Sequence, residues 1–146
     1  MYNGLLHAHS GLRWVVLVLL VLAIIKAFSG WFGKKEYTAG DKKIALFALI
    51  ATHIQLLLGL GLYFISPKVS FAEGAIQNEI YRFYTVEHMS MMIIAIIIIT
   101  LGFSLAKRTT EGTAKFRKTA LFYTLGLLII LSSIPWPFTV DGAGWF

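Results

Sequence analysis

Four long apolar segments make up most of this chain and contain almost no charged residue. With their apolar flanks, each approaches the ~20 residues that are needed to cross about 30 Å of hydrocarbon. Lipid satisfies no backbone hydrogen bonds, so only helices or closed barrels span it, and the unbroken aliphatic run from Met91 to Ile99 lacks the alternation of barrel strands. The sequence therefore predicts an all-α integral membrane four-helix bundle, with helices at approximately 8–28, 43–65, 82–106 and 118–136.

Composition limits what else the chain can contain. The four spans use nearly all of the 146 residues, so we expect a single domain over 1–146. The net charge of +6 does not indicate nucleic-acid binding, because the basic residues lie between the spans. The absence of cysteine excludes disulfides and covalent haem attachment. The N-terminus lacks the features of a cleaved signal peptide, so we expect its histidines to be retained.

The basic residues also predict the orientation. Ten of the 13 lysine and arginine residues lie in two connections, at 26–43 and 107–118. Short loops that are rich in lysine and arginine stay in the cytoplasm. We therefore expect a multi-pass protein of the bacterial inner membrane, in contact with the lipid bilayer, with both termini and the loop at 66–84 on the periplasmic side.

The two halves of the chain resemble a tandem repeat of helical hairpins. Each half opens with a histidine at the outer end of a helix and passes a basic turn. The chain then resumes with similar strings, Lys43-Ile44-Ala45-Leu46-Phe47 and Lys118-Thr119-Ala120-Leu121-Phe122. Two hairpins that run the same way imply a pseudo-twofold axis along the membrane normal.

Histidines in or near the spans are the first candidates for function, because a coordinating side chain in a membrane helix is costly and is usually functional. At 1.5 Å per residue, His9 and His88 lie about 26 and 28 Å from the inner lysines, and His53 lies only about 15 Å from them. His9 and His88 also occupy equivalent positions in the two halves, on helices that face each other if the connections are short. Two facing imidazoles at one depth predict the axial ligands of one b-type haem.

The other histidines leave alternatives open. His7 is a rival to His9, but helical spacing lets only one of them face the bundle, and its depth favours His9. His53 could be a buried histidine that donates to a carbonyl or to Thr52, a haem ligand opposite His88, or part of a quinone pocket with Gln55. The fourth segment has no histidine, so the sequence predicts a single haem and leaves a quinone open as a second cofactor.

Arg13 lies one turn below His9 on the same helix face. An arginine at this depth needs an anionic or carbonyl partner. A haem propionate fits through a bidentate contact. An ion pair with Glu87, next to His88, fits equally well, and the sequence does not decide between the two.

Three classes of function follow. The first is a haem protein that passes electrons between a membrane quinol or partner subunit and a periplasmic or membrane acceptor. The second is a structural subunit of a larger membrane complex without haem. The third is a copper or other metal handler, which the thioethers of Met89, Met91 and Met92 beside His88 would suit. We expect an electron-transfer protein or subunit, associated with other subunits or with a second copy, rather than a stand-alone enzyme.

Four motifs resemble small four-helix membrane proteins of Bacteroidetes-type bacteria that are labelled cytochrome b. They are His9-Ser10-Gly11-Leu12-Arg13-Trp14, Thr52-His53-Ile54-Gln55-Leu56-Leu57-Leu58-Gly59, Arg82-Phe83 with Glu87-His88, and Ile134-Pro135-Trp136-Pro137-Phe138. More distantly the chain is similar to one half of haem A synthase, to cytochrome b561 and to CopD-like proteins. The resemblance implies haem ligands on the first and third helices. Haem A synthase halves use the second and fourth helices, and the fourth helix here has no ligand.

The charge distribution predicts the topology directly. Reporter fusions at Gly40 and Gly112 should be cytoplasmic, because both positions lie in the basic connections. Fusions at Gly74 and at the C-terminus should be periplasmic. A cytoplasmic Gly74 would reverse the orientation and move His9 and His88 to the inner face.

Overall fold

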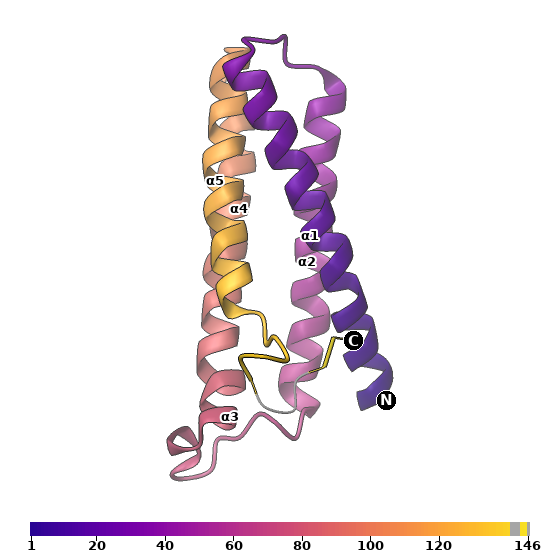
Figure 1. Ribbon diagram of the computed structural model, residues 1–146, viewed down its shortest axis with the longest axis vertical. Helices are drawn as coiled ribbons and strands as arrows, with labels where there is room; N and C mark the ends of the chain where they lie inside the picture. The colour runs from indigo at the N-terminus through magenta and orange to yellow at the C-terminus, as the bar shows by residue number, and fades with distance from the viewer. Residues whose placement is uncertain (141–143, 146) are drawn as a thin grey trace.

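The computed structural model describes residues 1–140 and 144–145, and its regular elements are all helical (Figure 1). Four segments are long and apolar enough to cross a membrane, which confirms the predicted all-α four-helix fold. The third segment joins a short helix, a π-helical turn and a long helix into one rod. In chain order the elements are α1 (Tyr2–Phe32), α2 (Ala39–Ile65), a 3-10 turn (Ala75–Gln77), α3 (Glu79–Arg82), a π turn (Phe83–Glu87), α4 (His88–Arg108) and α5 (Gly112–Ser133).

The four long helices form two hairpins, α1 with α2 and α4 with α5. The hairpins pack mainly through α1 and α5, whereas α2 and α4 make far fewer contacts. The helices α1 and α4 therefore lie on a diagonal, as the short connections predicted. Figure 1 shows both chain ends at the same end of the bundle as α3, opposite the turn between α1 and α2. The side of the membrane that each end faces stays a prediction.

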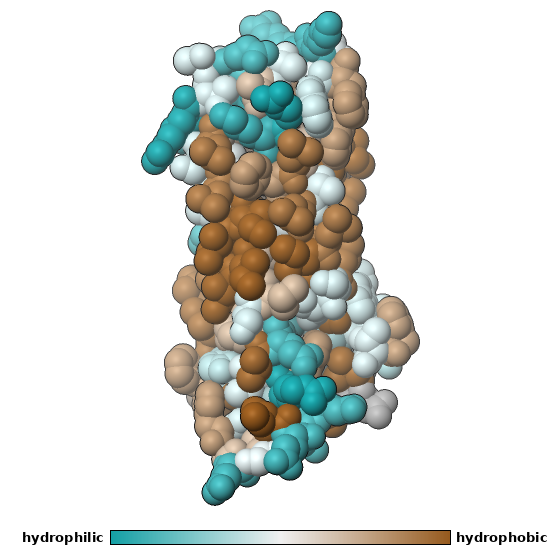
Figure 2. Space-filling view, turned by 90° about the vertical axis from the view of Figure 1, so that its left-hand side faces the viewer, coloured by the Kyte–Doolittle hydropathy of each residue, from teal (hydrophilic) through white to brown (hydrophobic). Residues whose placement is uncertain are grey.

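The outer surface of the bundle has the character of a lipid-facing surface. Figure 2 shows a hydrophobic band between two hydrophilic ends on the face that it displays. Large aliphatic side chains on all four long helices are more than half exposed, among them Val18, Leu57, Ile97 and Leu128. Exposed apolar surface of this extent is unusual on a soluble monomer and is expected in contact with hydrocarbon.

All four helices begin earlier than the sequence predicted, and α5 begins at Gly112 and not at 118. Local capping explains two of these starts. Thr38 and Asp41 form a capping box, in which the Asp41 amide donates to Thr38 Oγ1 at 3.3 Å and the Thr38 amide donates to Asp41 Oδ2 at 2.9 Å. The helix α2 therefore begins at Ala39 and not near 43. The Asn78 side chain accepts from two amides of α3, so the third rod begins at Glu79, before the predicted start at 82.

Two other predicted helix ends were also wrong. The helix α5 ends at Ser133 and not at 136, because Pro135 keeps Ile134 in an extended conformation. The helix α1 begins at Tyr2 and not near 8, since no proline interrupts the chain before His9. The earlier start adds almost two turns at the end that carries His9.

Small residues allow the helices of the second hairpin to approach each other closely. A Cβ at Gly126 of α5 would overlap Ile99 of α4 and would lie 2.8 Å from its Cδ1. Tyr123, fully buried, crosses to the first hairpin and donates from its hydroxyl to the Ala45 carbonyl at 2.7 Å. Ala45 and Ala120, which match in the repeat, are 3% and 0% exposed. Close backbone approach through small residues is the usual way that membrane helices associate.

Replacing Gly126 tests this packing. Alanine is favoured over glycine within a helix by about 1 kcal/mol. Gly126→Ala should nevertheless lower the unfolding temperature, because overpacking against the fully buried Ile99 costs about 1–3 kcal/mol. In the matched control Gly11→Ala, the new Cβ meets nothing within 4 Å and stability should rise. Circular dichroism on heating in detergent measures the unfolding temperature of both variants. A Gly126→Ala protein that is more stable than wild type would contradict the close contact between Gly126 and Ile99.

Candidate functional site

The rings of His9 and His88 meet between the two hairpins. Their centroids lie 6.5 Å apart and their planes cross at 73°. His9 belongs to α1, and His88 is the first residue of α4, so each hairpin contributes one ring. An imidazole centroid lies about 1 Å from its nitrogen and a metal–nitrogen bond is about 2 Å, so two imidazoles that share a metal have centroids about 6 Å apart. The separation of this pair therefore suits one metal ion between them.

Local structure fixes the position of His88. The π turn ends at the residue before it, and such wide turns are frequent at functional sites. His88 Nδ1 lies 2.7 Å from the Ser133 carbonyl oxygen, at the end of α5. Because a carbonyl only accepts, Nδ1 carries the proton and Nε2 of the neutral ring keeps its lone pair. Metal-ligating histidines commonly have this second hydrogen bond, which sets the tautomer and the ring orientation.

His9 is positioned from α2. A Cβ at Gly59 would lie 3.1 Å from Cε1 of His9, so glycine makes room for the ring. Gln55, one turn earlier on α2, donates from Nε2 to the His9 carbonyl at 2.8 Å. His7 is exposed, as expected if only one of the two histidines faces the bundle. We call this part of the molecule, around His9 and His88, the histidine end.

Three buried polar atoms at the histidine end have no hydrogen-bond partner among the described residues. They are His9 Nδ1, Gln55 Oε1 and Arg13 Nε. Buried polar atoms are nearly always paired, so unpaired ones need an explanation. The first belongs to the His9 ring itself, the second to the residue that donates to the His9 backbone carbonyl, and the third to Arg13, one turn along α1. The histidine end is thus suited to a ligand that carries polar groups.

Arg13 is 8% exposed and is held by aromatic residues. Its guanidinium lies 5.4 Å from the ring centroid of Trp14 and 5.8 Å from that of Trp136. It donates from Nη2 to the Trp145 carbonyl at 2.6 Å. The sequence required an anionic or carbonyl partner, and the structure supplies a carbonyl from the C-terminal segment. This arrangement retains a full positive charge close to the histidine pair.

Glu87, the other partner considered for Arg13, has a different contact. Its Oε1 accepts from Nε of Arg82 at 2.8 Å, and both side chains are about half exposed.

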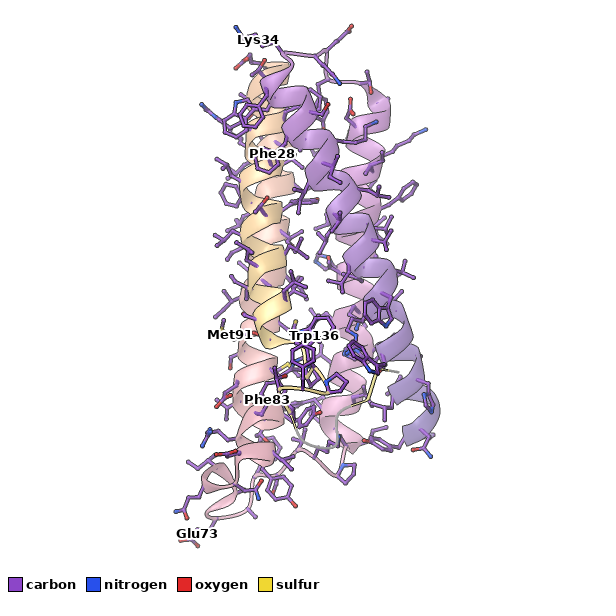
Figure 3. The ribbon with its side chains drawn as sticks, viewed as in Figure 1. Phe28, Lys34, Glu73, Phe83, Met91 and Trp136 are labelled. Carbon is purple, nitrogen blue, oxygen red and sulfur yellow. The ribbon has the colours of Figure 1, made fainter. Side chains whose placement is uncertain are left out.

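Aromatic rings occupy the space between the hairpins near His88. Figure 3 shows Phe83 and Trp136 there, and the rings of Phe83 and Tyr84 lie 5.8 and 6.4 Å from that of His88.

His53 lies away from the histidine pair. Its Nδ1 is 2.8 Å from the Leu49 carbonyl, one turn earlier on α2, in agreement with the first of its three interpretations. Its ring lines a groove of about 320 Å³ between α2 and α4. Gln55 contacts the His9 carbonyl instead, so the structure separates the two residues of the suggested quinone pocket. The ring that faces His88 is His9, not His53.

Other metal donors are few. Within 1–140 and 144–145 there is no group of three or more histidine, cysteine, aspartate or glutamate side chains that could hold a metal ion. Met92, one of the thioethers suited to copper, packs against the hydrophobic core. A metal at the histidine end would therefore need further ligands from outside the chain, as the macrocycle of a haem provides.

Sequence reasoning missed the contacts that complete the site. Ser133 and Trp145 act through their backbone carbonyls, which carry no signal in the sequence. The string from Ile134 to Phe138 entered the sequence analysis only as part of the family resemblance, and it did not show that Trp136 would turn back over Arg13. Gln55, a polar residue in an apolar span, was the detectable signal, and one of the open interpretations of His53 paired it with that histidine, whereas it contacts the carbonyl of His9.

Comparison with protein families, with curated proteins and with solved structures found no match.

The contacts of Arg13 and Glu87 predict that the two residues act independently. Arg13→Gln and Glu87→Gln should each change thermal stability, and the double variant should equal their sum within about 0.5 kcal/mol, because the pair shares no contact. As a control, Arg82→Gln with Glu87→Gln should show a coupling of about 0.2–1 kcal/mol, typical of an exposed ion pair. A coupling energy well above 1 kcal/mol between Arg13 and Glu87 would contradict this independence and would support an ion pair between the two halves.

Proposed function

We propose that the bundle binds one b-type haem at the histidine end, with His9 and His88 as axial ligands. In this function the protein passes electrons between a membrane quinol or a partner subunit and an acceptor on the periplasmic side or in the membrane. The observation that carries the proposal is the ring pair, 6.5 Å apart and contributed by both hairpins. The motif resemblance to proteins labelled cytochrome b points the same way.

The chain's residues fit a haem in three respects. His88 has its Nε2 lone pair available because Nδ1–H donates to Ser133. His9 has a buried Nδ1 without a hydrogen-bond partner in the described part of the chain, and a glycine lies beside its ring. Aromatic rings of Phe83 and Tyr84 surround His88 and provide apolar surface for a macrocycle. A haem with two histidine ligands exchanges single electrons and leaves no coordination position open for a substrate.

Arg13 has a defined part in this proposal. Its charge is buried, its Nε has no hydrogen-bond partner within 1–140 and 144–145, and its Nη2 donates to a neutral carbonyl. A carboxylate is a stronger partner than a carbonyl for a guanidinium, because the hydrogen bond is then charge-assisted on both sides. Arg13 is therefore suited to hold a haem propionate, and its positive charge would favour the reduced state of the haem. Trp14 and Trp136 limit the access of water to this contact.

The alternatives have less support. A copper site would draw on Met89, Met91 or Met92, but Met92 packs in the core, and the rings next to His88 belong to His9, Phe83 and Tyr84. A structural subunit without haem would not need two neighbouring histidine rings, one of which has its tautomer fixed by a carbonyl. Such a role is what a colourless, metal-free purified protein would indicate.

The ligand assignment is tested with histidine variants. The full-length protein should be expressed with haem available, purified in detergent, and examined by reduced-minus-oxidised absorption spectra. Wild type should show a sharp Soret band and split α and β bands. His9→Ala and His88→Ala should each abolish this spectrum, because each removes one of the two facing rings.

Two further variants serve as matched controls. His7→Ala changes an exposed residue two positions from His9, and His53→Ala removes a ring that faces a different groove, so both should keep nearly the full haem content. Circular dichroism should show that all four variants keep their helices. Loss of haem in His53→Ala together with its retention in His9→Ala would make His53 the ligand in place of His9.

A further inference from the structure

The π turn before His88 changes which side chains share a face with its ring. The turn spans Phe83–Glu87, and the His88 amide closes it by donating to the Phe83 carbonyl, five residues earlier. In a regular α-helix, two residues five positions apart point about 140° away from each other. Here the rings of Phe83 and His88 are neighbours, with centroids 5.8 Å apart. The extra residue of the π turn therefore brings Phe83 onto the face of His88.

Contacts from two other segments hold the middle of this turn, at Thr85. Tyr63, near the end of α2, donates from its hydroxyl to the Thr85 carbonyl at 2.9 Å. In the loop after α2, the Ser70 amide donates to Thr85 Oγ1 at 3.1 Å, and Thr85 Oγ1 donates to the Ser70 carbonyl at 3.4 Å. Thr85 is 8% exposed. Because π turns are rare, the turn needs support from outside itself, and Thr85 receives it from both segments.

The Tyr63 contact joins the first hairpin to the residues just before His88. Thr85 lies three positions before His88, which is less than one helical turn. If the turn relaxed to α-helical hydrogen bonding, the segment held by Tyr63 and the segment that begins at His88 would rotate relative to each other by about 100°. The hydrogen bond of His88 Nδ1 to the Ser133 carbonyl and the ring contact with His9 both depend on the present register.

We propose that Tyr63 and Thr85 are positioning residues for His88. Their hydrogen bond keeps the π turn in register, and the turn directs the His88 imidazole towards that of His9. Both residues act through the backbone of the turn. As support for an axial ligand, this role rests on the proposed haem function, whereas the direction of the ring is a property of the protein itself and is measurable without haem.

A pair of tyrosine variants separates positioning from general stability. Tyr63→Phe removes the hydroxyl and keeps the ring, which packs at 5.8 Å from that of Phe71. Tyr123→Phe is the matched control, because the Tyr123 hydroxyl also donates to a backbone carbonyl of the other hairpin. Tyr123 lies ten residues before Ser133, about 15 Å along α5 from the histidine end.

A pair of threonine variants tests the other half of the contact. Thr85→Val removes the hydroxyl from a side chain of the same shape, so it loses the two hydrogen bonds to Ser70. Thr85→Ser keeps the hydroxyl and should behave as wild type. Circular dichroism should show that all of these variants keep their helices.

The measurement uses full-length, ¹⁵N-labelled protein purified without haem in detergent. Hydrogen exchange of the His88 amide reports the opening of the turn. Tyr63→Phe should speed this exchange about fivefold, because exchange follows the opening equilibrium and one hydrogen bond is worth about that factor. The ring nitrogen signals of His88, identified by their absence in His88→Ala, should lose part of the Nδ1–H tautomer in Tyr63→Phe and in Thr85→Val. Both readouts should stay at their wild-type values in Tyr123→Phe.

Three results would overturn the proposal. One is a Tyr63→Phe protein with the exchange rate and the His88 ring signals of wild type. Another is an equal change in Tyr123→Phe, which would show a general loss of stability. The third is a Thr85→Ser protein whose His88 ring signals change as much as those of Thr85→Val.

The haem function and this role can fail separately. In titrations with haemin, Tyr63→Phe should bind about fivefold more weakly than wild type, and Tyr123→Phe should bind as wild type does. A wild-type protein that binds no haem, but whose His88 ring responds to Tyr63→Phe, would refute the haem proposal alone. A haem-binding protein in which Tyr63→Phe changes neither haemin affinity nor the His88 ring signals would refute this role alone.

Discussion

Backbone carbonyl oxygens are the partners of most polar side chains inside this bundle. Hydrocarbon offers no hydrogen bonds, so a polar side chain in a membrane span must find its partner within the protein. Tyr123 uses the carbonyl of Ala45, His88 that of Ser133, and Arg13 that of Trp145. These three contacts join segments far apart in the sequence. They therefore place the second hairpin, the start of α4 and the C-terminal segment relative to the rest.

The same constraint determines which atoms stay available for a ligand. A histidine that donates from Nδ1 to a carbonyl keeps a lone pair on Nε2, and His53 and His88 both do so. Their surroundings then differ. The ring of His88 lies next to another imidazole between the hairpins, and His53 lines an aliphatic groove between α2 and α4.

The closeness of packing differs from one pair of helices to another. Glycines let α4 and α5 approach closely, and contacts between α2 and α4 are sparse. The groove lies at that sparse contact. At the histidine end, Gly59 makes room for a ring, and aromatic side chains fill the space between the hairpins. Glycine therefore brings α4 and α5 close together in one place, and at the histidine end it leaves space for the His9 ring.

The sequence by itself determined the four helices, their hairpin order and the equal depth of His9 and His88. These properties follow from hydrophobic length, from short connections and from the rise of a helix, all of which are local. It also indicated that Arg13 needs a partner, because a buried charge cannot be left alone. Only the tertiary structure decided that the partner is the Trp145 carbonyl, that Gln55 serves His9, and that His53 lines a separate groove. Carbonyl groups are the same in every residue, so which carbonyl meets which side chain is set by the packing of whole helices and not by the pattern of side chains along them.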